Sequence, residues 1–103
     1  MGLNRLMMKN GNPKDVFIAY IDRTIRQFED NALTTVGDDA FNGCELLTSI
    51  NLPNVTTVGY DAFSNCSSLK EIHFAAKNKE AIEALSDYSN KFGAPIATIY
   101  FDI

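Results

Sequence analysis

A single histidine, His73, is the first side chain in this 103-residue sequence that suggests chemistry, because imidazole is the most common general base in proteins. Glu71 lies two positions before it. The sequence repeats every 22 residues, as described below, and Ser49 is the residue one repeat before Glu71. A Ser–His–Glu group can therefore be drawn on two neighbouring strands. Nucleophilic catalysis also needs a pocket and an oxyanion hole, which an open strand does not supply. We therefore expect no enzymatic activity, and we expect His73 to be a solvated surface residue or a contact to a partner.

Cys44 and Cys66 form a second group with chemical potential, and they too occupy equivalent sites of adjacent repeats. Their Cα atoms would therefore lie about 4.8 Å apart, which a disulfide can span. Their side chains would run parallel, however, and this disfavours the dihedral angle of a disulfide. We expect buried thiols that fill the core, with a disulfide as the alternative. Two cysteines and one distant histidine do not make a zinc site, so neither a metal nor a cofactor is predicted.

Three aspartates, Asp38, Asp39 and Asp61, stand where short helical turns are expected to begin. A calcium site would need more oxygen ligands within one tight loop. A carboxylate at the start of a helical turn stabilises exposed N–H groups, so we expect these residues to cap the turns. Gly37 and Gly59, just before them, are expected to supply a bend.

An internal repeat must position these side chains. Residues 33–54 read LTTVGDDAFNGCELLTSINLPN and residues 55–76 read VTTVGYDAFSNCSSLKEIHFAA, with 10 of 22 positions identical. The shared positions are nearly all apolar or glycine, whereas the positions that differ are mostly polar. This pattern is typical of a solenoid, in which each unit buries its apolar side against the next unit. Residues 24–32 continue the register backward as a partial repeat.

The string VG-x-x-AF-x-x-C-x-x-L-x-x-I-x-L resembles the BspA-type leucine-rich repeat, which occurs in bacterial surface proteins, in some protists and in phage-encoded proteins. The two full repeats match it closely and the partial repeat matches it in part. The resemblance implies a role in adhesion, in surface display or as a phage structural part, and it implies that the cysteine of each repeat fills the core. The IDRTI lead-in and the ATIYFDI end also look like segments that flank short arrays of this family.

The predicted fold class is α+β: a short leucine-rich-repeat-like solenoid with N- and C-terminal helical caps and a final strand. We expect a single domain over 1–103. Its parts are an N-terminal helical cap (1–23), two full repeats plus a partial one (24–76) and a C-terminal cap helix and strand (77–103). The caps must cover the open faces of the stack, because two full repeats alone leave most strands at an edge.

Each cap has sequence signals of its own. A helix over 13–21 is expected after Asn12, and a helix over about 79–92 is expected after Asn78 as its N-cap. A last strand should follow beside residues 69–74, with Ile99, Phe101 and Ile103 on one side. The apolar residues Leu3, Leu6 and Met7 should form a further short helical segment, which packs on the cap or serves as a seam for self-association.

The repeat strands LTSINL (47–52) and LKEIHF (69–74) define the expected core and the expected surface. Period-2 alternation directs Ile50, Leu52, Ile72 and Phe74 inward, and Phe41 should stack on Phe63. The residues between them face outward and form the candidate partner-binding face: Gln27, Glu29, Ser49, Asn51, Glu71 and His73. Tyr20, Tyr60 and Tyr100 are expected to be partly exposed.

The net charge is −4 at pH 7, and residues 29–76 carry seven acidic side chains against one lysine. Such a region repels phosphate, so a nucleic-acid partner is not expected. No apolar run has the length of a membrane helix, and the N-terminus has no secretion signal, so no membrane insertion is expected. The expected partner is a protein, with a glycan as a second class and a second copy of the chain, joined through the N-terminal segment, as a third.

The sequence therefore predicts a non-catalytic module for protein binding, adhesion or a structural role, which presents a strand face to its partner. Its place would be a cell surface or a virion within a larger protein. The alternative is a stand-alone phage-type inhibitor or adaptor that binds a host protein in the cytoplasm, because an acidic face can occupy a basic groove.

Overall fold

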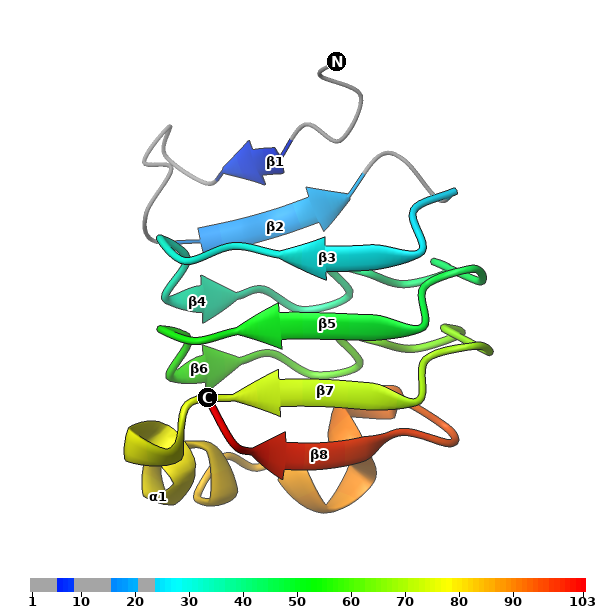
Figure 1. Ribbon diagram of the computed structural model, residues 1–103. Helices are drawn as coiled ribbons and strands as arrows, with labels where there is room; N and C mark the ends of the chain where they lie inside the picture. The colour runs from blue at the N-terminus through cyan, green and yellow to red at the C-terminus, as the bar shows by residue number, and fades with distance from the viewer. Residues whose placement is uncertain (1–5, 9–15, 21–23) are drawn as a thin grey trace.

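The computed structural model describes residues 6–8, 16–20 and 24–103, with side chains from residue 24 onward. Within these residues the strands form two four-stranded sheets, which lie one behind the other in Figure 1. The rear sheet contains, in spatial order, β1 (Leu6–Met8), β2 (Val16–Tyr20), β4 (Thr35–Val36) and β6 (Thr57–Val58). The front sheet contains β3 (Gln27–Glu29), β5 (Ser49–Leu52), β7 (Glu71–Phe74) and β8 (Thr98–Phe101).

Most neighbouring strands pair in parallel, and the pairing follows the sequence repeat. In the front sheet Phe28 lies opposite Ile50, and Ile50 lies opposite Ile72, so each residue faces its equivalent in the next repeat. In the rear sheet Thr35 lies opposite Thr57 in the same way. The predicted register, including the strand of the partial repeat, is confirmed. Each full repeat contributes one strand to each sheet, and the next repeat adds its strands beside them.

The core lies between the two sheets. Ile50, Leu52, Ile72 and Phe74 are each 0% exposed, as their alternation with polar residues predicted. Burial of one such side chain contributes about 1.5–3 kcal/mol. The rings of Phe41 and Phe63 are stacked with their centroids 5.5 Å apart, so the predicted stacking is confirmed. Equivalent residues of successive repeats therefore pack on one another and fix the spacing of the strands above them.

The turns that follow β4 and β6 are not helical, contrary to expectation. Asp39 and Asp61 have φ values of 58° and 54°, in the left-handed region, so these residues cannot begin a right-handed helical turn. The turns instead bond to each other: Phe41 N–H donates to the carbonyl of Ala62 at 2.8 Å. Asp38 accepts the backbone N–H of Tyr60 at 2.9 Å, so this carboxylate caps the next turn rather than its own.

Gly59 is required by close packing rather than by a bend. A Cβ atom at this position would lie 2.5 Å from the backbone nitrogen of Asp38 and 2.8 Å from the carbonyl carbon of Gly37. Neither Gly37 nor Gly59 has a positive φ, so the expected use of glycine for an unusual backbone angle is wrong at both positions. The absent side chain lets one turn lie directly against the previous turn.

The predicted N-terminal helical cap is wrong where the structure describes it. Val16–Tyr20 form β2, which pairs in parallel with β4, and Leu6–Met8 form β1, which is antiparallel to β2. All but one of the residues of VFIAY are β-branched or aromatic, and such residues favour a strand. Residues 13–15 and 21 of the expected helix, and Leu3, lie outside the described residues. Self-association through Leu3, Leu6 and Met7 stays a prediction.

The C-terminal cap is also less regular than predicted. In place of one helix over 79–92, the chain forms η2 (Ala76–Asn78), α1 (Lys79–Glu83) and η3 (Tyr88–Gly93). Asn78 does not cap α1 with its side chain, which donates instead to the carbonyl of Val55 at 3.4 Å and so ties the cap to the last full repeat. No helix in the described ranges has the length and apolar character needed to cross a membrane.

The final strand is where the sequence placed it. β8 pairs in parallel with β7, with His73 opposite Tyr100 and Phe74 opposite Phe101. The rings of Phe74 and Phe101 are stacked with centroids 5.9 Å apart, which extends the core to the last strand of the front sheet. Ile103, expected on the same side as Phe101, is 48% exposed and lies beyond the end of β8.

Candidate partner-binding face

The six candidate residues lie together on the outer surface of the front sheet, which we call the strand face. Because the strands pair in parallel, the outward side chains form two rows that cross all four strands. One row contains Gln27, Ser49, Glu71 and Thr98, and the other contains Glu29, Asn51, His73 and Tyr100. Neighbours within a row are about 4.8 Å apart, and the rows are about 6.6 Å apart along the strands.

The half of the strand face over β3 and β5 is hollowed. A depression of about 260 Å³ is lined by Gln27, Phe28, Glu29, Ser49 and Asn51. Phe28 lies in an inward position, and its ring meets that of Phe41 with centroids 5.1 Å apart. The four polar side chains of this hollow form no hydrogen bonds with other residues in the part of the chain that the structure describes. They are therefore available to a ligand.

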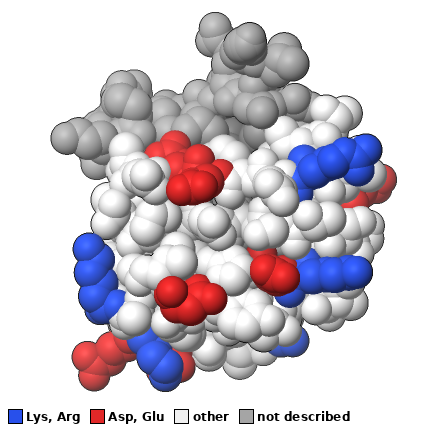
Figure 2. Space-filling view, in the orientation of Figure 1, with Lys and Arg blue, Asp and Glu red and all other residues white. Residues whose placement is uncertain are grey.

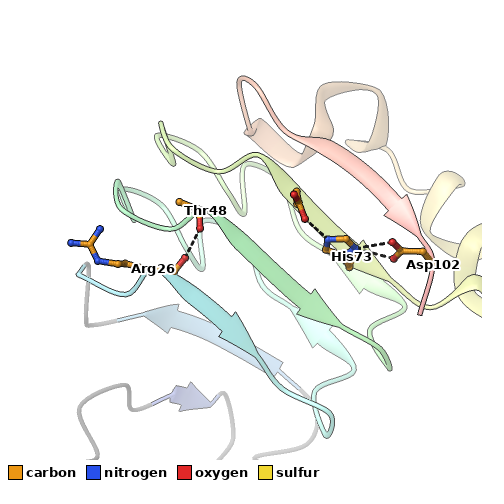
Figure 3. Close-up of polar contacts among 5 residues, drawn as sticks. Arg26, Thr48, His73 and Asp102 are labelled. Carbon is orange, nitrogen blue, oxygen red and sulfur yellow. Dashed lines mark hydrogen bonds and ion pairs between the residues drawn. The ribbon is translucent and has the colours of Figure 1, made fainter.

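The half over β7 and β8 is closed by contacts around His73. Its Nδ1 lies 2.8 Å from Oδ1 and 3.1 Å from Oδ2 of Asp102, and its Nε2 lies 2.8 Å from Oε1 of Glu71. Figure 3 shows the imidazole between the two carboxylates. The ring also stacks on Tyr100, with centroids 4.9 Å apart and an angle of 12° between the planes. Only 17% of the His73 side chain is exposed, so the expectation of a solvated histidine is wrong.

The two carboxylates favour the protonated form of His73. Burial alone lowers the pKa of His73, but the hydrogen bonds and negative charges of Asp102 and Glu71 outweigh burial and raise that pKa above its usual value of 6.5. Glu71 and Asp102 have half-exposed side chains. Solvent therefore screens each ion pair, and the bridge makes a modest contribution to stability.

This geometry does not resemble a catalytic histidine. Both ring nitrogens are engaged by carboxylates, so neither is left to accept a proton from a substrate hydroxyl. Ser49, the expected nucleophile, lies opposite Glu71 and not opposite His73. The imidazole of His73 is hydrogen-bonded to Glu71 and Asp102 rather than to a nucleophile. The carboxylates of Asp102 and Glu71 lie on opposite nitrogens of the ring, so they do not point toward a common position where a metal ion could bind. Within the described part of the chain, no three His, Cys, Asp or Glu side chains are placed to hold a metal ion.

Asp102 contacts the strand face through His73, and the candidate residues chosen from the sequence did not include it. His73 and Tyr100 lie opposite each other on β7 and β8. Their separation in the sequence is longer than one repeat, so the repeat period does not predict which residues of β8 lie beside His73. The expected exposure of Tyr100 is confirmed at 38%, as is that of Tyr60 at 57%, whereas Tyr20 lies outside the residues with described side chains. The signal that could have found Asp102 is the alternation in TIYFDI, which places it on the same side as Tyr100.

The strand face is acidic. Glu29, Glu71 and Asp102 bring three carboxylates to it, and neither row contains a lysine or an arginine. Figure 2 shows red acidic groups over the middle of this face and blue basic groups toward its left and right margins. Arg26 immediately precedes β3, and its carbonyl accepts a hydrogen bond from the Thr48 hydroxyl at 3.0 Å (Figure 3). Lysine and arginine side chains therefore lie at the margins of the strand face and not on its rows (Figure 2).

The cysteines lie beneath the strand face and take no part in it. Cys44 and Cys66 are both 0% exposed and are not joined in a disulfide, so the expectation of buried thiols is confirmed. The Cys66 thiol donates to the carbonyl of Phe41 at 3.0 Å. This bond connects two successive repeats within the core.

The comparisons with known proteins agree with the repeat geometry. A family model described as BspA type leucine rich repeat region (6 copies) matches residues 19–94. Neither the curated proteins nor the solved structures yielded a match. The matched region includes both full repeats, the partial repeat and most of the C-terminal cap. Because the match extends over most of the sequence, this chain belongs to the BspA-type leucine-rich repeat family.

Proposed function

We propose that this chain is a non-catalytic binding module, in adhesion or in a structural assembly, that docks a protein partner on its strand face. Repeats of its family generally mediate protein binding or adhesion. The observation that carries the proposal is the contrast between the two sides of the front sheet. Its inner side over β5 and β7 is filled with fully buried apolar residues, whereas its outer side over β3 and β5 presents polar side chains without hydrogen-bonding partners in the described chain.

Rigidity supports this use of the strand face. The inward residues Phe28, Ile50 and Ile72 stand in register beneath the outward residues, and the stacked Phe41 and Phe63 support them from below. Repeats paired in this way hold their surface side chains at fixed spacing before a partner arrives. Less conformational entropy is then lost on binding, which favours affinity.

The charge and shape of the face favour a protein with a basic segment over a glycan or a nucleic acid. Carboxylates of Glu29, Glu71 and Asp102 repel phosphate and attract lysine or arginine. Tyr100 is stacked on His73, and Phe28 lies against Phe41, so these rings are engaged within the protein rather than offered to a sugar.

The acidity of the face also favours a second candidate function, an inhibitor or adaptor that occupies a basic surface of a host protein. The two functions share the strand face and differ in the partner. An adhesion or structural partner would be an extracellular or assembly protein, whereas an inhibited partner would lose its own activity when this chain binds.

Site-specific cross-linking tests the proposal, because it joins the partner covalently to the residue that it contacts. A photoreactive phenylalanine analogue is placed at Ser49 on the strand face and, as a matched control, at Thr57, which is exposed on β6 of the rear sheet. The expected result is one dominant cross-linked protein from position 49 and none from position 57. Equal cross-linking of that protein from both positions would contradict the proposal.

A further inference from the structure

We propose that the hollow over β3 and β5 receives an arginine side chain of the partner. The inference rests on the proposed function, because it names the group that the strand face recognises. The hollow is formed by Gln27 and Ser49 in one row and by Glu29 and Asn51 in the other. Each of these side chains carries an oxygen that can accept a hydrogen bond.

The arrangement of these acceptors suits a guanidinium group. The four residues stand at the corners of a grid of about 4.8 Å by about 6.6 Å, set by the strand spacing and by the repeat along each strand. A guanidinium is planar and directs five N–H donors outward from one centre, whereas an ammonium has only three donors on a compact, strongly hydrated charge. Glu29 supplies the one formal negative charge of the grid, and the other three corners supply neutral acceptors.

The other half of the same face shows how such a grid accommodates a planar cation. Over β7 and β8, the imidazole of His73 lies between two carboxylates and donates from both ring nitrogens when it is protonated. Its flat ring stacks on Tyr100 of the neighbouring strand. A planar donor from the chain itself therefore fills this half. Over β3 and β5, Gln27 and Ser49 stand in the row of Glu71, and none of the residues described as lining the hollow carries a positive charge.

A peptide titration followed by NMR tests the proposal on the intact chain. The probe is an acetylated and amidated Gly-Ser-Arg-Ser-Gly peptide, and the matched control peptide contains citrulline, which has the shape of arginine without its charge. We expect the side-chain amide signals of Gln27 and Asn51 to shift with the arginine peptide. Binding of the citrulline peptide should be at least about tenfold weaker, which corresponds to about 1.4 kcal/mol.

Two substitutions should change the affinity in opposite directions. Glu29→Gln removes the formal charge and should weaken binding of the arginine peptide by about tenfold, whereas Asn51→Asp adds a second carboxylate and should strengthen binding. Glu45→Gln, at an exposed position away from the hollow, removes the same charge and should leave the affinity unchanged. The substituted positions are exposed or partly exposed, so the substitutions should leave the core intact. Unshifted NMR signals of the core residues would verify that each variant is folded.

The proposal would be overturned by equal binding of the arginine and citrulline peptides, by equal binding of a lysine peptide, or by shifts that lie outside the hollow. Any of these outcomes leaves the proposed function standing if position 49 still cross-links a partner. Conversely, binding of the arginine peptide in the hollow without a cross-linked partner would support the pocket and contradict the proposed docking face.

Discussion

Asp102 accepts a hydrogen bond from Nδ1 of His73 at 2.8 Å, and this contact joins the residue after β8 to the middle of β7. The last strand of the front sheet is thereby held at its C-terminal end by an ion pair as well as by its backbone hydrogen bonds. Glu71 bonds to the opposite nitrogen of the same ring at 2.8 Å. The bridge depends on the charge of His73, so the attachment of β8 depends on pH.

Stability should therefore fall as the solution becomes alkaline. Because the pKa of His73 is higher in the folded chain than in the unfolded chain, the bridge contributes fully below the unfolded value near 6.5 and is lost as pH rises through the raised pKa. We expect the difference in unfolding free energy between the wild type and His73→Gln to decrease by about 0.5–1 kcal/mol from pH ~5.5 to pH ~8.5. Urea unfolding at both pH values measures it.

The ring of His73 offers an independent measurement of the same bridge. Its NMR titration midpoint should lie above the usual value, and Asp102→Asn should lower that midpoint because one negative charge is removed. A midpoint at or below 6.5 in the wild type, or one that Asp102→Asn leaves unchanged, would contradict the assigned contacts.

Ile72 tests the core beneath the strand face. This side chain is 0% exposed, so Ile72→Val should reduce the unfolding free energy by about 0.5–1.5 kcal/mol through the loss of one buried methylene. Ile96 is 53% exposed and provides the matched control, because Ile96→Val should change stability by less than about 0.5 kcal/mol. Chemical denaturation measures both. Equal effects of the two substitutions would show that β7 does not cover a packed core.

Gly59→Ala should destabilise the fold although it adds only one methyl group. That methyl would meet the backbone of Asp38 and Gly37, which cannot rotate away as a side chain can. We expect a loss of about 1–3 kcal/mol from overpacking. Tyr60→Ala, at the exposed neighbouring position, should cost less than about 0.5 kcal/mol. Thermal unfolding distinguishes the two, and an undisturbed Gly59→Ala variant would refute the close approach of the turns.

The thiols of Cys44 and Cys66 should resist modification in the native protein. Both are 0% exposed, so an aromatic disulfide reagent should react with them only at the rate at which the chain unfolds. Ser67→Cys introduces a thiol at an exposed position beside Cys66 and should react at once. Two rapidly reacting thiols in the wild type would be incompatible with their place in the core.

The repeated part of the fold could be predicted because the same residues serve the same packing role twice. Ile50 and Ile72 occupy equivalent sites of successive repeats, so their alignment indicated the strand register and the inward and outward faces together. The six strand-face residues followed from that register. Their hydrogen-bonding partners did not, since contacts such as His73 with Asp102 join positions outside the repeat.

The caps could not be predicted in the same way, because each occurs once. β2 pairs with β4 in a register that departs from the repeat period, and the Asn-Pro sequence before β2 imitates the start of a helix. In the C-terminal cap, Lys91 and Phe92 both have φ of 53°, so the helical stripe that includes Phe92 is broken by the backbone. Packing against the last repeat outweighs local helix propensity there.

The affinity of two double variants for the cross-linked partner shows whether that protein docks on the strand face. Ser49→Arg with Asn51→Arg places bulk and positive charge on this face, whereas Thr56→Arg with Thr57→Arg makes the same change at exposed positions around β6. By isothermal titration calorimetry, the first variant should bind at least about 100-fold more weakly than the wild type, or about 2.7 kcal/mol, and the second should bind as the wild type does. If the first variant keeps both its melting temperature and the wild-type affinity, the partner does not dock on the strand face.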